Sequence, residues 1–228
     1  MLLSYNGLEG SMQMRLYGIV GAGGFGREVM PVAEEMLAAT DNAEAEIVFV
    51  DENRELGSVN GHRVISPAEF LASDADKYFN ITIAEYAIRK RFARELAAGK
   101  ASPFSITARN SVRMHGNVIG EGAILCAYTT ITSNAKIGKY FHANIYSYVA
   151  HDCVIGDFVT FAPDVHCNGG VMVEDYAYIG TGAILKQGTR EKPIVIGRGA
   201  VVGMGAVVTK SVAPFTTVMG NPAAPLGK

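Results

Sequence analysis

An apolar residue recurs at every sixth position through the second half of the chain. Twelve consecutive positions in steps of six, from Ile119 to Leu185, are all apolar, and the fourth residue after each is small or β-branched at eleven of them. A period of six matches neither the 3.6 residues of a helical turn nor the two of a strand. It predicts a solenoid in which each unit forms one short strand and a corner, and three units close one coil. After a five-residue slip at 191–195 the pattern resumes at Ile196.

Glycine is frequent, with 26 residues in a chain of 228, and six glycines keep step with the repeat. We expect them at the corners of the coil, where a positive φ or the crowding of neighbouring coils excludes a side chain. They are Gly120, Gly138, Gly156, Gly180, Gly197 and Gly203.

Catalytic side chains in such a solenoid have to point outward, because the first and fifth positions of each unit are filled by packing. His151 takes a third position, and Asp152 follows it. A neutral imidazole can accept a proton near pH 7, and an adjoining carboxylate can fix its tautomer and raise its basicity. The pair is our candidate general base, although one outward histidine can also be an ordinary surface residue. His142 and His166, at sixth positions, are expected at the surface or between subunits.

The three cysteines indicate neither nucleophilic catalysis nor a metal site. Cys153 and Cys167 fall at interior positions, and Cys126 is expected to point outward without a partner. A reactive cysteine needs a partly exposed thiol. No CxxC spacing occurs, so no disulfide or zinc framework is predicted.

The first half of the chain alternates strand-like and helix-like segments. Strands are expected at 16–20, 46–50, 78–83 and 104–106, and helices at 27–39 and 88–96. Strands that alternate with helices predict a mostly parallel sheet. We therefore predict a small α/β domain over 14–106 and the solenoid over 107–228, with 1–13 as a leader or disordered segment.

A glycine-rich loop follows the first expected strand. Gly21, Gly23 and Gly26 match G-x-G-x-x-G between a strand and a helix, where the helix N-terminus attracts a phosphate. Asp51, at the end of the second strand, is placed to bond a ribose hydroxyl. The domain has about half the strands of a dinucleotide fold. A nucleotide or nucleotide-sugar site is therefore favoured over NAD redox chemistry, and a purely structural turn is the third alternative.

Charge and hydropathy exclude several classes of partner. The formal net charge is −2, and no basic run or long apolar stretch occurs. Nucleic acid and membrane are therefore not expected as partners. The N-terminus lacks the pattern of a signal peptide, so a cytoplasmic location is expected.

Four segments together resemble the bacterial sugar acyltransferases of the sialic-acid O-acetyltransferase and PglD type. They are the glycine loop 21–26, the strand end 49–52, the pair Ile88 and Arg89, and the segment 151–157. The likeness extends from Leu16 to about Pro222. It implies a half-Rossmann domain for a nucleotide-linked sugar and a left-handed parallel β-helix, assembled as a homotrimer with acetyl-CoA bound between subunits.

The resemblance also implies a role for individual residues. The catalytic set would be His151, Asp152, Asn144 and, as backbone oxyanion donor, Gly169. The acetyl-CoA contacts would be Gly180, Thr181, Gly182, Gly203, Gly205, Thr160, Asn221 and Pro222. The nucleotide-sugar contacts would be Gly23, Gly24, Phe25, Asp51, Glu52 and Ala84. Relatives often have histidine where this chain has Phe25, and some relatives have histidine where it has Thr160. The excursion 187–193, expected near the cofactor end, is not typical of the shortest relatives.

We expect an acetyl-CoA-dependent N-acetyltransferase that acts on the 4-amino group of a nucleotide-linked 4-amino-4,6-dideoxy sugar for surface-glycan (lipopolysaccharide O-antigen) biosynthesis. The alternative is a sugar O-acetyltransferase of the sialic-acid type. A metal hydrase like the γ-carbonic anhydrases is less favoured, since the outward histidines include no H-x4-H pair and no metal is expected. A non-catalytic trimeric scaffold is the remaining class.

Overall fold

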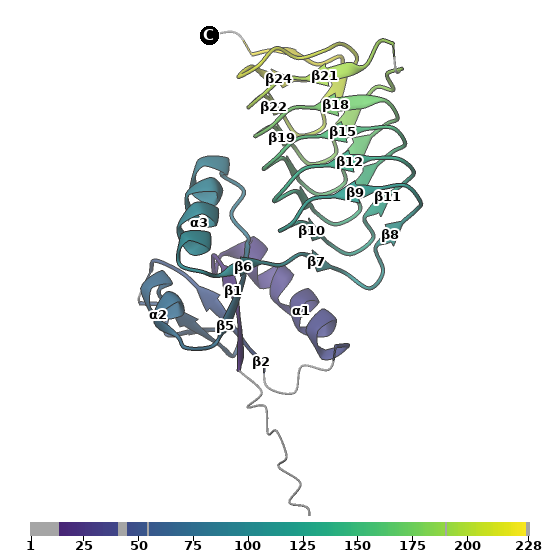
Figure 1. The fold of residues 1–228 in the computed structure, drawn as a ribbon. Coiled ribbons are helices and arrows are strands. Elements are labelled where there is room, and N and C mark those ends of the chain that lie inside the picture. The colour runs from purple at the N-terminus through teal and green to yellow at the C-terminus, as the bar shows by residue number, and fades with distance from the viewer. Residues whose placement is uncertain (1–13, 41–44, 54, 190, 227–228) are drawn as a thin grey trace, which may run out of the picture.

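The fold is taken from a computed structural model, which describes residues 14–40, 45–53, 55–189 and 191–226. The expected leader 1–13 lies outside the described residues. Two parts are visible: an α/β domain, and a solenoid that rises from it with α3 beside its first coils (Figure 1).

The α/β domain contains a six-stranded sheet in the order β3-β4-β2-β1-β5-β6. Its strands are β1 (Arg15–Val20), β2 (Ala45–Val50), β3 (Ser58–Val59), β4 (His62–Ile65), β5 (Asp76–Ile81) and β6 (Ser102–Pro103), and its helices are α1 (Gly24–Ala38), α2 (Pro67–Ala72) and α3 (Tyr86–Ala98). The central strands are parallel, with Val20 opposite both Val50 and Ile81. The segments that follow β1, β2 and β5 therefore meet at one edge of the sheet.

The solenoid is a three-sided parallel β-helix with one sheet on each face. Face 1 consists of β7 (Ile106–Thr107), β10 (Ile124–Leu125), β13 (His142–Ala143), β16 (Thr160–Phe161), β19 (Tyr178–Ile179), β22 (Val201–Val202), β24 (Thr217–Met219) and β25 (Ala224–Pro225). Face 2 consists of β8 (Val112–Arg113), β11 (Thr130–Ile131), β14 (Tyr148–Val149), β17 (His166–Cys167), β20 (Ile184–Leu185) and β23 (Val207–Val208). Face 3 consists of β9 (Val118–Ile119), β12 (Lys136–Ile137), β15 (Val154–Ile155), β18 (Val171–Val173) and β21 (Ile194–Ile196). The chain runs from face 1 to face 2 to face 3, so we name the corners edge 1–2, edge 2–3 and edge 3–1.

The sequence repeat explains this architecture. Ile124 pairs with His142, eighteen residues later, which is one coil of three six-residue units. The repeated apolar residues fill the interior in one continuous core from Leu125 to Val218. The predicted hexapeptide-repeat β-helix and the preceding Rossmann-like domain are both confirmed.

The corner glycines are required by crowding and not by a positive φ. None of the six expected corner glycines has a left-handed backbone. A Cβ on Gly138 would lie 2.4 Å from Asp157 Oδ1 and 2.7 Å from the carbonyl carbon of Gly156 in the next coil. Since real Cβ atoms do not approach so closely, the spacing between coils excludes a side chain there.

The change from one domain to the other divides the strand that was expected at 104–106. β6 extends the sheet of the α/β domain beside β5, whereas Ile106 pairs with Ile124 on face 1 of the β-helix. Ile106 and Ile124 pack in one cluster with Ile19 and Met30 of the α/β domain. The two domains thus share a continuous apolar core.

Candidate active site

His151 and Asp152 form a hydrogen-bonded pair on edge 2–3, directly after β14. His151 Nδ1 lies 2.7 Å from Asp152 Oδ2, and the side chains are 55% and 60% exposed. The Asp152 N–H donates to the Ser133 carbonyl of the preceding coil, which fixes the corner. An imidazole that donates its Nδ1–H to a carboxylate presents the Nε2 lone pair to a substrate. The pair is therefore built to accept a proton at Nε2.

Gly169 lies against this imidazole one coil further on. A Cβ at Gly169 would be 2.5 Å from His151 Nε2, so the backbone itself adjoins the proposed base. Gly170 donates to the carbonyl of His151, and Gly188 donates to that of Gly169, each at 3.0 Å. Within the described part of the chain, the Gly169 N–H has no acceptor. A free N–H beside the base fits the predicted oxyanion donor, a role that stays a prediction.

A cavity of about 690 Å³ opens beside the pair. Besides His151 and Asp152 it is lined by Asn134, Lys136, Val154, Gly170, Val171, Met172, Gln187, Gly188, Thr189 and Pro193. Gln187, Gly188, Thr189 and Pro193 of the excursion thus form a wall of the cavity beside His151. Lys136, Val154 and Met172 were not predicted. They are paired neighbours on face 3, and their outward positions in the repeat were the available signal.

The residues predicted to bind acetyl-CoA lie on a different edge. The turns 180–182 and 203–205 follow β19 and β22, so both are on edge 1–2, and Gly205 donates to the Thr181 carbonyl at 2.8 Å. Asn221 and Pro222 follow β24 on the same face. Asn144 follows β13 and is also on edge 1–2, where its Nδ2 donates to the Phe161 carbonyl at 2.8 Å. Within a single chain, the residues on edge 1–2 are therefore separated from His151, which lies on edge 2–3.

Two outward positions of face 1 are covered by the α/β domain. Thr160 and His142 are paired neighbours on this face, and both are buried. Thr160 Oγ1 is buried and has no hydrogen-bond partner among the described residues, and its contact with acetyl-CoA stays a prediction. His142 was expected at the surface or between subunits. Instead it lies in the interface between the two domains.

The cysteines are all buried. Cys153 Sγ and Cys167 Sγ are 3.9 Å apart in the β-helix core, as their interior positions predicted. Cys126 takes an outward position of the coil, as expected, but the α/β domain covers it, and burial raises its pKa to about 12. Over the residues that the structure describes, no group of three or more His, Cys, Asp or Glu side chains could hold a metal ion.

The glycine loop lies at the carboxyl edge of the sheet with the other predicted nucleotide-sugar contacts. Gly23 and Gly24 are exposed at the start of α1, and Ala84 is exposed where the chain leaves β5 for α3. Phe25 has its ring 5.2 Å from that of His142. Asp51 Oδ2 accepts a hydrogen bond from the Ala22 N–H at 2.9 Å. This hydrogen bond holds the glycine loop against the end of β2. The contact of Asp51 with a ribose stays a prediction.

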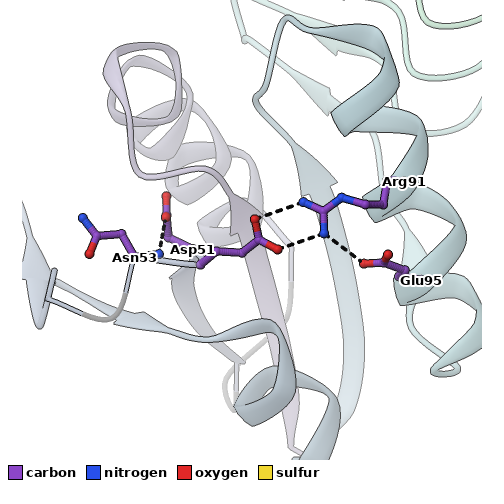
Figure 2. Close-up of polar contacts among 5 residues, drawn as sticks. Asp51, Asn53, Arg91 and Glu95 are labelled. Carbon is purple, nitrogen blue, oxygen red and sulfur yellow. Dashed lines mark hydrogen bonds and ion pairs between the residues drawn. The ribbon is translucent and has the colours of Figure 1, made fainter.

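Glu52 forms an ion pair with Arg91, a residue that was not predicted to belong to the site. Arg91 on α3 donates from Nη1 and Nη2 to the two carboxylate oxygens of Glu52, at 2.8 and 3.0 Å (Figure 2). The hydrogen bond from Arg91 is the main reason why the pKa of Glu52 is lowered. Arg91 Nη1 also lies 3.5 Å from Glu95 Oε2. No motif or spacing in the sequence links Arg91 to Glu52.

Comparison with known proteins gives a consistent assignment. Residues 18–96 match the family model of the PglD N-terminal domain. The GDP-perosamine N-acetyltransferase of Escherichia coli O157:H7 is 50% identical over 211 residues, which are 92% of this chain and 96% of that protein.

Two solved structures share the fold over nearly the whole chain. WeeI from Acinetobacter baumannii AYE has a TM-score of 0.89 and 48% identity, covering 93% of this chain and all of WeeI. The acetyltransferase domain of PglB from Neisseria gonorrhoeae FA1090, solved in complex with acetyl coenzyme A, has a TM-score of 0.83 and 29% identity, with 93% and 100% covered. The chain therefore belongs to the PglD-type family of hexapeptide-repeat sugar N-acetyltransferases.

Proposed function

We propose that the protein transfers the acetyl group of acetyl-CoA to the amino group of a nucleotide-linked amino sugar. The identity to the E. coli GDP-perosamine N-acetyltransferase over almost the full length supports this activity. The observation that carries it is the His151 and Asp152 pair, which faces a cavity and adjoins a free backbone N–H at Gly169. We propose a 4-amino-4,6-dideoxy sugar on a nucleoside diphosphate as the acceptor, and GDP-perosamine is the first to test.

We assign each group one step of the reaction. The neutral sugar amine attacks the thioester carbonyl, so that a C–N bond forms and the C–S bond breaks. His151 Nε2 takes the proton of the amine, Asp152 orients the ring, and the proton then leaves with the CoA sulfur. The Gly169 N–H donates to the oxyanion, a contribution of about 3–4 kcal/mol in comparable sites.

The separation of the two edges supports a homotrimer. The base is on edge 2–3, whereas the predicted acetyl-CoA turns are on edge 1–2. A ring of three chains that places edge 2–3 of one beside edge 1–2 of the next completes three identical sites and closes on itself. Edge 1–2 is also apolar. Tyr128 and Tyr146 stack at 5.1 Å and are each 56% exposed, Ile145 is 40% exposed, and Met204 is 74% exposed. A neighbouring chain would cover these side chains.

The location is proposed from the substrates. In the parts of the chain that the structure describes, no helix has the length and apolarity to cross a membrane. Acetyl-CoA and nucleotide sugars are intracellular metabolites, so we place the reaction in the cytoplasm, where it would serve surface-glycan biosynthesis.

The direct test is acetyl transfer. Purified protein is incubated with acetyl-CoA and GDP-, UDP- or dTDP-linked 4-amino sugars, and CoA release and the acetylated product are measured. We expect turnover with at least one of these acceptors and none without an acceptor. If none of these nucleotide amino sugars supported turnover of acetyl-CoA, the proposal would be wrong.

Subunit mixing tests the shared site. His151→Ala disables edge 2–3, and Thr181→Trp blocks the exposed turn on edge 1–2; each variant alone should be inactive. In a mixed ring of three, one interface still pairs two intact edges. Equal mixing after co-refolding should therefore restore about a quarter of wild-type turnover. A mixture that stays inactive while forming mixed trimers would place the site within one chain.

A further inference from the structure

Arg91 and Glu52 form an ion pair across the carboxyl edge of the sheet. Glu52 follows β2, whereas Arg91 projects from α3, and the guanidinium meets both carboxylate oxygens (Figure 2). Glu95 approaches the same guanidinium from one turn along α3. The contact is solvent-accessible, with Arg91 37% and Glu52 58% exposed. A paired cation thus lies at the edge where the nucleotide-sugar contacts are predicted.

This pair can be exchanged at small cost. Exposed ion pairs contribute about 0–1 kcal/mol, since water screens them and two side chains lose freedom. The planar fork of arginine fits a carboxylate and a phosphate with the same two-pronged geometry. A diphosphate carries more negative charge than one carboxylate. It can therefore replace the carboxylate of Glu52 as the partner of Arg91.

A small hollow lies beside this ion pair, at the same edge of the sheet. The hollow has a volume of about 170 Å³ and is lined by Val20, Gly21, Val50, Asp51, Glu52 and Ile83 on the sheet side and by Ile88 and Phe92 of α3. This volume equals that of about six molecules of liquid water. It is too small for a nucleoside but sufficient for phosphate groups. The glycine loop borders the same hollow, held there by the bond from Ala22 to Asp51. The fifteen-residue helix α1 begins at this loop and directs its N-terminal dipole to it.

Two carboxylates at this edge of the sheet would repel an anionic ligand. Asp51 and Glu52 are adjacent, and Asp51 already accepts two backbone N–H groups, from Ala22 and Asn53. Among the described residues, Glu52 makes no hydrogen bond or ion pair other than that with Arg91. Its carboxylate therefore competes with a phosphate for Arg91.

We propose that Arg91 is a phosphate-binding residue of the nucleotide-sugar site, and that Glu52 holds its guanidinium until the diphosphate of the ligand replaces the carboxylate. The inference rests on the proposed function, because it assumes a nucleoside-diphosphate ligand. It also changes the role of Glu52 from a ligand contact to a competitor of the ligand.

The two roles of Glu52 predict effects of opposite sign. If Glu52 contacts the nucleotide sugar, Glu52→Gln weakens binding. If Glu52 competes for Arg91, Glu52→Gln frees the guanidinium and strengthens binding. Arg91→Met weakens binding through loss of a charge-assisted hydrogen bond. Arg91→Lys keeps the charge without the fork, so its affinity should lie between those of Arg91→Met and the wild type.

The experiment is calorimetric titration of the full-length protein with GDP and with UDP, which need no catalysis. For the nucleotide that binds, we expect Arg91→Met to raise Kd about tenfold or more and Glu52→Gln to lower it about twofold to fivefold. Arg94→Met removes an exposed cation of the same helix and should leave Kd unchanged. The KM for acetyl-CoA should stay at the wild-type value in all variants.

The outcomes separate this inference from the proposed function. If the wild type binds a nucleotide and Arg91→Met binds it equally well, or Glu52→Gln binds it more weakly, the inference is overturned and the proposed function stands. If the wild type binds neither nucleotide and acetylates no nucleotide amino sugar, the proposed function fails, and the inference with it. Thermal unfolding checks that each variant is folded.

Discussion

The guanidinium of Arg89 on α3 lies against the imidazole of His142 on β13, with Nη1 2.5 Å from Nδ1, where the two domains meet. Arginine can only donate, so Nδ1 accepts and the ring proton is on Nε2. Nε2 donates to the Ile81 carbonyl at 2.8 Å, and Arg89 Nη2 donates to the Phe158 carbonyl. Both side chains are fully buried. The pair therefore connects the carboxyl edge of the sheet to the β-helix through a neutral imidazole.

Replacing Arg89 should weaken the whole fold. Arg89→Ala removes a large buried side chain and leaves two acceptors, His142 Nδ1 and the Phe158 carbonyl, without a donor. We expect the free energy of unfolding to fall by about 2–4 kcal/mol, measured by urea denaturation. Arg94→Ala, an exposed position on the same helix, is the matched control and should change it by less than about 0.5 kcal/mol. An equal effect of the two substitutions would contradict the assigned role of Arg89.

Acid should destabilise the protein through His142. Burial and, secondly, the neighbouring Arg89 charge hold the pKa of His142 well below 6.5. Above pH 6.5 the ring is neutral in both the folded and the unfolded protein, so His142 makes its full contribution to the free energy of unfolding. Below pH 6.5 the unfolded chain takes up a proton that the folded protein excludes, and stability falls. Between pH 7.5 and 5.5 the wild type should lose about 1.4 kcal/mol more than His142→Asn.

Urea denaturation at pH 7.5, 6.5 and 5.5 measures this difference. Asn is chosen because its side-chain oxygen can still accept from Arg89. His166→Asn, which removes a partly exposed imidazole away from the domain interface, is the control. The same loss in the wild type and in His142→Asn would show that another group causes the acid sensitivity.

The repeat made the β-helix predictable, whereas the domain interface was not. A period of six is a local property, so the faces and the interior residues could be read without knowing any long-range contact. His142 occupies an outward position by that same pattern, and only the placement of the α/β domain on face 1 buries it. Cys126 is likewise outward by this pattern, and the α/β domain covers it. Periodicity states which way a residue points, but not what covers it.

The candidate site shows a similar division. The pairing of His151 with Asp152 follows from adjacency on an outward corner, so sequence sufficed for it. The neighbourhood of Gly169 and His151 depends on the stacking of successive coils, which the eighteen-residue register supplies. The Arg91 contact with Glu52 joins segments 39 residues apart in different elements, and no spacing rule connects them.

Loss of the base should affect turnover and not folding. Because His151 is exposed on a corner, His151→Ala should fold normally and lower kcat by at least about 10². Asp152→Asn should be milder, since it affects orientation and basicity, and asparagine tolerates the φ of 61° at this corner. Steady-state kinetics with a nucleotide amino sugar measures both. His166→Ala removes another histidine bonded to an aspartate, Asp164 at 2.9 Å. If this control lost as much activity as His151→Ala, the assignment of the base would be wrong.

A single methyl group at Gly169 should inactivate the enzyme while leaving the fold intact. Gly169 has no left-handed backbone, so alanine is allowed there. Its Cβ would lie 2.5 Å from His151 Nε2 and 2.6 Å from Cε1, and the exposed imidazole has room to move away. Displacing the base by about 1 Å costs about 10² in rate. We therefore expect kcat to fall about a hundredfold, with a melting temperature within a few degrees of the wild type.

The matched control is Gly57→Ala, where a Cβ meets no heavy atom within 4 Å. It should leave both kcat and the melting temperature unchanged. The double variant Gly169→Ala with His151→Ala adds a sharper criterion. If the methyl group acts by displacing the imidazole, it has nothing left to displace once the ring is gone. The double variant should then be no slower than His151→Ala alone. A further hundredfold loss would mean that Gly169 acts independently of the base, through the oxyanion N–H that its backbone presents to the substrate.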